Sequence, residues 1–155
     1  MELIKQQYEF IKSSRNVLFN YCTTLSERDF IAENSSFGKG SIRNLLVHIG
    51  NTYEFWIGKH ALGRDIDIPA YVSISNIPAV ITYFLSIDNL LEDFLTLYSG
   101  KMHKEINVIL DNIPGTVSPL KLFCHVITHE FHHKGQILSL SRHLGYIPID
   151  TDIIR

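Results

Sequence analysis

The sequence predicts an all-α protein, a four-helix bundle with long connectors and an extended C-terminal tail. Apolar residues recur at helical spacing in four segments of roughly 22 to 27 residues each. Residues that cap helices precede two of these segments, and glycines follow the ends of three. The 155 residues contain no internal repeat and are enough for a buried core, so we expect one domain over residues 1–155.

The first two helices are separated by a polar loop. The first is predicted from about Glu2 to Leu25, because apolar residues recur there every three or four positions. The loop runs from Ser26 to Gly40. The second helix begins after Ser41, a candidate N-cap, and is predicted to continue to Gly63.

A connector from Arg64 to Asn76 leads to the third helix, which is predicted from Ile77 to Tyr98. The segment from Lys104 to Val117 has a different pattern. It combines a short β-branched run with Pro114-Gly115, a dipeptide typical of turns. We expect this segment to be irregular, with at most one short extended piece.

The fourth helix has the clearest start. Ser118 is a candidate N-cap, and Pro119 suits the first helical turn because its backbone nitrogen needs no partner there. The apolar pattern continues to about Leu144, and Gly145 follows. Residues 146–155 are predicted to form an extended arm along the surface.

The composition and net charge limit the kinds of binding partner that we expect. Hydrophobic residues make up 45% of the chain, charged residues 19%, and the net charge is −2, so neither nucleic acid nor a membrane is expected as partner. No apolar run is long enough to cross a bilayer, and the first residues do not resemble a secretion signal. The two cysteines, Cys22 and Cys124, form no CxxC motif. We therefore expect a cytoplasmic protein.

Four of the eight histidines lie within a nine-residue stretch of the fourth helix: His125, His129, His132 and His133. His129 and His133 are four residues apart, so a helix places them on one face, one turn apart. Two imidazoles in this arrangement can bind one metal ion. His48, near the apolar face of the second helix, is the best candidate for a third ligand, and three imidazoles would leave one coordination position open.

Other interpretations of these histidines stay open. His48 could be a hydrogen-bonded core residue. His125 could be a fourth ligand or could contact a ligand of the metal, and Gln136 could orient a ligand or a neighbouring helix. Residues 129–133 also satisfy H-E-x-x-H, in which Glu130 would be the general base of a zinc protease. We regard that match as coincidental, because Gln136 stands where metzincins have glycine and no glutamate follows Glu130.

The motifs resemble a known family. The stretch HVITHEFHHKGQ (His125 to Gln136), the later LGYIP and the aspartates Asp150 and Asp152 resemble the DinB-like family of bacterial four-helix bundles, which includes YfiT-like metal hydrolases. The segment SIRNLLVHIGNTYEFW, which contains His48, resembles the second helix of that family. The resemblance covers most of the chain and is most specific in the last helix.

The resemblance implies a site and a choice of chemistry. In the family, one histidine of the second helix and the HxxxH pair of the last helix bind a divalent metal; here these are His48, His129 and His133. Zinc or nickel is expected first, with iron or manganese as alternatives. Some members are thiol S-transferases that use low-molecular-weight thiols, and others are hydrolases. Glu130 is a candidate proton acceptor for either reaction. A small-molecule substrate and a homodimer are also implied, and a non-catalytic metal-binding or stress-related protein is the remaining alternative.

Overall fold

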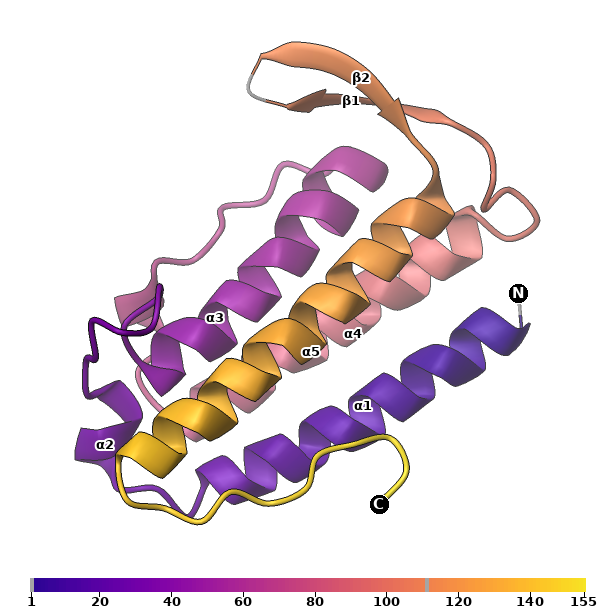
Figure 1. Ribbon diagram of the computed structural model, residues 1–155. Coiled ribbons are helices and arrows are strands. Elements are labelled where there is room, and N and C mark those ends of the chain that lie inside the picture. The colour runs from indigo at the N-terminus through magenta and orange to yellow at the C-terminus, as the bar shows by residue number, and fades with distance from the viewer. Residues whose placement is uncertain (1, 111) are drawn as a thin grey trace.

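The computed structural model describes residues 2–110 and 112–155, and it is mostly helical with a small two-stranded sheet. The prediction of a mostly helical chain is confirmed. The elements in order are α1 (Glu2–Cys22), α2 (Glu27–Ile31), α3 (Ile42–Tyr53), the π-helix η1 (Glu54–Ala61), the 3-10 turn η2 (Tyr71–Ser73), α4 (Ile77–Leu97), β1 (Ile106–Leu110), β2 (Ile113–Val117) and α5 (Pro119–His143). The long helices α1, α3, α4 and α5 run alongside one another (Figure 1).

Side-chain caps set the starts of three long helices. Ser41 Oγ accepts a hydrogen bond from the backbone N–H of Asn44 at 3.1 Å, and α3 begins at the next residue. Ser118 Oγ accepts from the N–H of Lys121 at 3.3 Å, with Pro119 at the first position of α5. Both caps were predicted. Asn76 caps α4 in the same way. These caps fix where α3 and α5, the two helices that carry the candidate ligands, enter the fold.

The structure of the segment before α5 differs from the prediction. It was predicted to be irregular, but β1 and β2 form an antiparallel hairpin. Pro114 and Gly115 lie inside β2, paired with Ile109 and Val108, rather than in a turn. The residue with turn geometry is Asn112, whose φ of 65° is one that asparagine tolerates better than most residues. The hairpin lies over one end of the helices (Figure 1).

Three further helix boundaries differ from the prediction. The first helix ends at Cys22 rather than Leu25, and the expected loop contains α2, with Ser26 as its N-cap. The second helix is not uniform: its α-helical part ends at Tyr53, and η1 continues with a wider turn. Contacts with other elements, rather than local sequence, hold η1: Tyr83 donates to Glu54 at 2.7 Å, and Tyr98 donates to the Ala61 carbonyl at 2.6 Å.

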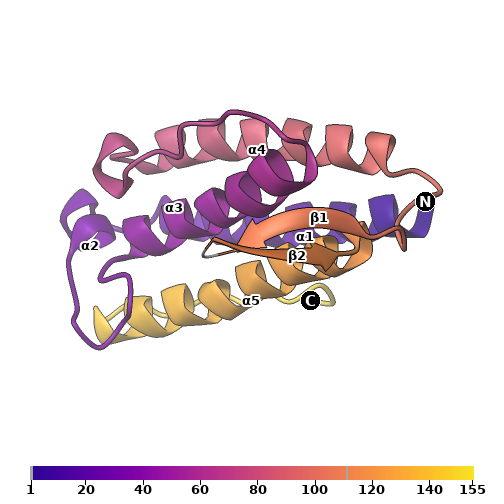
Figure 2. The same cartoon turned by 90° about the horizontal axis from the view of Figure 1, so that it is seen from above.

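The core lies between the long helices. Its fully buried side chains come from every one of them and include Ile11 and Leu18 of α1, Leu45 and Ile49 of α3, Phe84 and Phe94 of α4, and Phe123 and Ile137 of α5. Helices α3 and α5 pack side by side (Figures 1 and 2). Among the described residues, no helix is both long and apolar enough to cross a membrane.

The chain after α5 has no helix or strand and returns along α1 (Figure 1). Three contacts hold it there. The Thr151 carbonyl accepts hydrogen bonds from Ser14 Oγ and from Lys134 Nζ, both buried, and Arg155 donates to Ser13 Oγ at 2.9 Å. The extended C-terminal arm predicted from the sequence is therefore present.

Candidate metal centre

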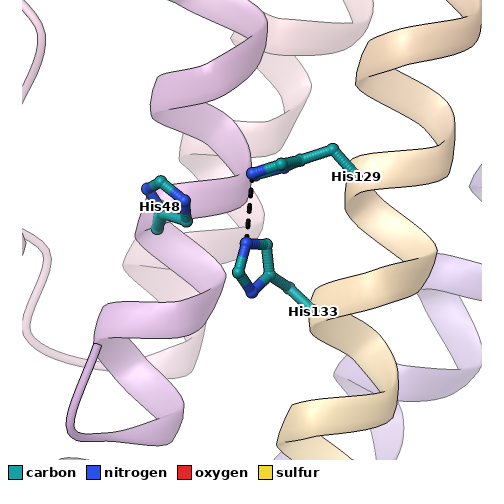
Figure 3. A group of neighbouring side chains, drawn as sticks. All are labelled: His48, His129 and His133. Atoms are coloured by element: carbon teal, nitrogen blue, oxygen red, sulfur yellow. Dashed lines mark hydrogen bonds between the residues drawn. The ribbon is translucent and has the colours of Figure 1, made fainter. Parts of the chain in front are cut away.

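Three histidines meet where α3 and α5 pack together. His48 comes from α3, and His129 and His133 come from successive turns of α5 (Figure 3). The ring centres are 4.9 Å apart for His48 and His129, 4.7 Å for His48 and His133, and 4.3 Å for His129 and His133. One ring nitrogen from each lies within 4.8 Å of the other two. We call these residues the histidine triad.

A hydrogen-bond chain determines which nitrogen His133 offers. Gln136, one turn further along α5, has its Oε1 2.7 Å from His133 Nδ1 and its Nε2 3.2 Å from His132 Nε2. The amide oxygen can only accept, so Nδ1 of His133 carries the proton and donates it to Gln136. The lone pair of His133 is therefore on Nε2, the nitrogen that faces His129.

The triad fits a divalent metal ion. His133 Nε2 lies 3.1 Å from His129 Nε2. In a tetrahedral site with metal–nitrogen bonds of ~2.05 Å, two ligand nitrogens lie about 3.4 Å apart, close to this spacing. Within the described part of the chain, Nδ1 of His129 is buried and has no hydrogen-bond partner. Without a metal, Nε2 of His129 must carry the proton that it donates to Nε2 of His133, whereas a metal bound to both Nε2 lone pairs would take the place of this hydrogen bond.

The surroundings keep the imidazoles neutral. Burial, followed by positive charge on Lys39 and His133, lowers the pKa of His48 from 6.5 to about 4. Burial, followed by repulsion from His133 and His48, lowers the pKa of His129 to about 3. The pKa of His133 is also lowered, mainly by burial, although its bond to Gln136 opposes the shift. Neutral imidazole is the form that binds metal, so the triad is ready to bind at neutral pH.

His125 and His132 lie beside the triad, with ring centres 5.9 Å from His129 and 4.9 Å from His133 respectively. His125 lies one turn before His129, and its ring contacts Trp56 of η1 with the centres 5.3 Å apart. The cluster of ligand-type side chains found among the described residues includes neither His125 nor His132. His132 instead contacts Gln136, which the sequence had marked as a residue that could orient a ligand.

Glu130 lies in a different environment from its neighbour His129. Its side chain is fully buried and accepts hydrogen bonds from Arg15 Nε at 3.0 Å, from another Arg15 nitrogen at 2.9 Å and from Tyr53 Oη at 2.7 Å. Arg15 also pairs with Asp88 of α4 at 2.6 Å. Among the described residues no hydrogen bond joins Glu130 to the triad. Its role as a proton acceptor stays a prediction.

Sequence patterns missed this buried network. Arg15 and Glu130 are 115 positions apart, and a single arginine in an amphipathic helix is normally exposed. The one available signal was its position: Arg15 lies four residues after Ile11 and three before Leu18, on the apolar face of α1.

A mostly helical chain with three histidines gathered between two helices has the features of a metal-binding helical protein. The comparison with protein families agrees: the model of the DinB family matches residues 1–155, and this chain belongs to the DinB family. No curated protein sequence matches the chain.

Proposed function

We propose that the chain is a metal-dependent enzyme in which His48, His129 and His133 hold one divalent ion. The observation that carries the proposal is the approach of three imidazoles from two helices to within 4.8 Å. Zinc and nickel are the first candidates, with iron and manganese as alternatives, because imidazole suits several first-row metals. Three protein ligands would leave a coordination position for a small molecule.

The reaction we propose first is the transfer of a low-molecular-weight thiol to an electrophilic small molecule. A bound divalent ion supplies Lewis acidity, which favours the thiolate form of a thiol and lowers the pKa of water. The thiolate sulfur bonds to an electrophilic carbon, the leaving group departs with its electron pair, and the thiol proton passes to solvent. The chain contributes three neutral imidazoles at one point, with His133 oriented by Gln136.

Two alternatives use the same triad. The first is metal-assisted hydrolysis, in which water takes the open position. The second is a metal-binding or stress-related protein without turnover. In either enzyme, Glu130 is proposed as a proton acceptor. Proton uptake would compete with the three hydrogen bonds that its carboxylate already accepts.

The proposal extends to the whole chain. We propose that residues 1–155 form one DinB-like domain, a four-helix bundle, that acts on a small molecule in the cytoplasm. The net charge of −2 gives no support to a nucleic-acid or membrane partner. A homodimer is the oligomeric state to test by sedimentation.

The reaction is tested with zinc- or nickel-loaded protein and a panel of low-molecular-weight thiols, with a chloronitrobenzene as electrophile. The proposal predicts thiol consumption and release of one chloride per thioether. The variant His48→Ala/His129→Ala/His133→Ala is expected to lose this activity, whereas His103→Ala, which removes an exposed histidine outside the triad, is expected to keep it.

Each alternative has its own result. Hydrolysis of model esters or amides, lost in the triple variant and without thiol consumption, would replace the transferase with a hydrolase. Metal bound by the triad, with neither activity, would leave a binding protein. Equal activity in the triple variant and the wild type would contradict every version of the proposal that uses the triad.

A further inference from the structure

A pocket of about 430 Å³ opens beside the histidine triad. His48 and His129 form part of its wall. The rest of the wall is largely aromatic and apolar, with Phe55 and Trp56 from η1, Ile68 from the connector and His125 from α5, and it also includes the uncharged polar residues Asn51 and Thr52 of α3. Two of the three triad residues therefore border a space that could hold a molecule larger than water. An engineered cavity of ~150 Å³ is enough for benzene, so a substituted ring fits a space of this size.

The aromatic part of the wall is held in place from two sides. The rings of Trp56 and His125 meet edge to face, with centres 5.3 Å apart and planes at 76°, so η1 and α5 are in contact across the pocket. Phe55 contacts Trp56 in the same way at 5.1 Å and 87°. Phe55 and Trp56 belong to the π-helix η1, and π-helical turns are frequent at functional sites.

The base of η1 is anchored by polar contacts, some of them made by Asn51, which is itself part of the wall. Tyr83 of α4 donates a hydrogen bond to Glu54 at 2.7 Å and lies 3.0 Å from Asn51 Oδ1. The Asn51 amide also donates to the Pro69 carbonyl at 3.1 Å, next to Ile68. The connector and η1 are thereby tied to α3, which carries His48. The pocket wall and the triad are therefore both connected to α3.

The wall carries no aspartate, glutamate, lysine or arginine. Lys39, whose charge influences the pKa of His48, is not part of the wall. Apart from a metal ion bound by the triad, the wall offers no ionic partner, so a charge on the body of the bound molecule would lose hydration without compensation, which is unfavourable.

We infer that this pocket is the substrate subsite of the metal centre and that it takes a neutral, apolar group, aromatic or alkyl, with the reactive end of the molecule toward His48 and His129. The inference rests on the proposed function for the role of the triad. It adds the substrate class: the electrophile is an uncharged molecule with an apolar body, and charged analogues of the same shape are excluded.

The chain offers a direct reporter, because Trp56 is its only tryptophan. Nitrobenzene is a neutral aromatic quencher, and 4-nitrobenzenesulfonate is the same ring with a negative charge. Both are titrated into the wild-type protein, with and without zinc, while tryptophan intensity and lifetime are recorded. Nitrobenzene is expected to quench saturably with an unchanged lifetime, as a bound molecule does. The sulfonate is expected to bind at least tenfold more weakly.

Two lysine substitutions give a matched comparison. Ile68→Lys places a charge in the wall and is expected to weaken nitrobenzene binding at least tenfold. Leu85→Lys, at an exposed position of α4 outside the pocket, is expected to leave binding unchanged. Circular dichroism verifies that both variants are folded, and the comparison of the two quenchers on the wild type does not depend on either variant.

Metal content, measured on the same samples, separates this inference from the proposed function. Purely collisional quenching by nitrobenzene, or equal binding of the two quenchers, in protein that contains its metal would overturn the subsite and leave the metal centre intact. Protein that holds no metal at the triad would overturn the proposed function and, with it, the substrate role of the pocket, even where nitrobenzene binds.

Discussion

Gln136 Oε1 accepts a hydrogen bond from His133 Nδ1 at 2.7 Å, so His133 presents its Nε2 lone pair to the other triad residues. Hydrogen bonds of this kind to metal-binding histidines fix the tautomer and the ring orientation, and their loss costs about 10- to 100-fold in metal affinity. We predict a loss of this size for Gln136→Leu, measured by competition with a chelating indicator.

Two control variants sharpen the test of Gln136. Gln136→Glu keeps an acceptor for His133 Nδ1 and is expected to retain most of the affinity. Gln6→Leu makes the same change at an exposed position of α1 and is expected to have no effect. Unaltered metal affinity in Gln136→Leu would show that the contact does not orient His133.

The histidine pKa values predict how stability depends on pH. The pKa values of His48 and His129 in the folded protein, about 4 and about 3, lie below the value of 6.5 for a free histidine. The unfolded chain therefore binds more protons between these values, and protonation favours unfolding. The metal-free protein is expected to lose stability as the pH falls from about 6.5 toward 4 through these groups.

The pH prediction is best checked on the groups themselves. In a titration of the metal-free protein followed by NMR, the ring protons of His48 and His129 are expected to change well below pH 6.5. His103, which is exposed, supplies the comparison in the same spectra. Midpoints near 6.5 for the triad residues would mean that burial does not keep them neutral.

The buried pair of Arg15 and Glu130 is expected to matter mainly for stability. Glu130→Ala leaves the Arg15 charge buried and without its main partner, which typically costs about 3–5 kcal/mol. Replacing both residues, as Arg15→Met/Glu130→Leu, is expected to be less harmful, because no fully buried charge is left unpaired and Asp88, the other partner of Arg15, is partly exposed. Chemical denaturation measures both, with Glu92→Ala on the surface of α4 as the control.

A further variant, Glu130→Gln, tests whether Glu130 is a proton acceptor. If its role is structural, Glu130→Gln reduces stability and leaves the activity of the folded, metal-loaded protein near that of the wild type. A loss of activity of 100-fold or more with little change in stability would support the base role instead. A double variant less stable than Glu130→Ala would contradict the structural interpretation of the pair.

Two helical glycines should respond in opposite directions to alanine. At Gly50 of α3, a Cβ would lie 2.3 Å from the ring of Tyr83, so alanine forces repacking at a cost of about 1–3 kcal/mol. At Gly135 of α5 a Cβ meets nothing within 4 Å, and alanine should stabilise the helix by up to about 1 kcal/mol. Thermal unfolding measures both, and destabilisation of equal size at the two sites would contradict the packing observed at Gly50.

Local patterns were sufficient to predict the helices and to nominate the triad. The serines at 41 and 118 act within their own turns, and the spacing of His129 and His133 is a property of one helix. His48 could be nominated because it lies on the apolar face of its own helix. That His48, His129 and His133 lie together depends on how α3 and α5 pack. The spacing suggested this arrangement, and the structure shows it.

The features that were missed depend on distant contacts. Nothing near Arg15 indicates a partner 115 residues away. The change to a π-helix at Glu54 involves no proline, and η1 is contacted by Tyr83 of α4 and by Tyr98, which follows α4. The hairpin before α5 was hidden by Pro114-Gly115, which can pair at the edge of a two-stranded sheet although it is typical of turns.

Elemental analysis of untagged protein, purified without added metal, tests the proposed metal centre most directly. The triad predicts about one divalent ion per chain. The ion should be absent from His129→Ala/His133→Ala and present at the wild-type level in His103→Ala. A metal content well below one ion per chain, and the same in all three proteins, would contradict the proposal that His48, His129 and His133 form a metal site.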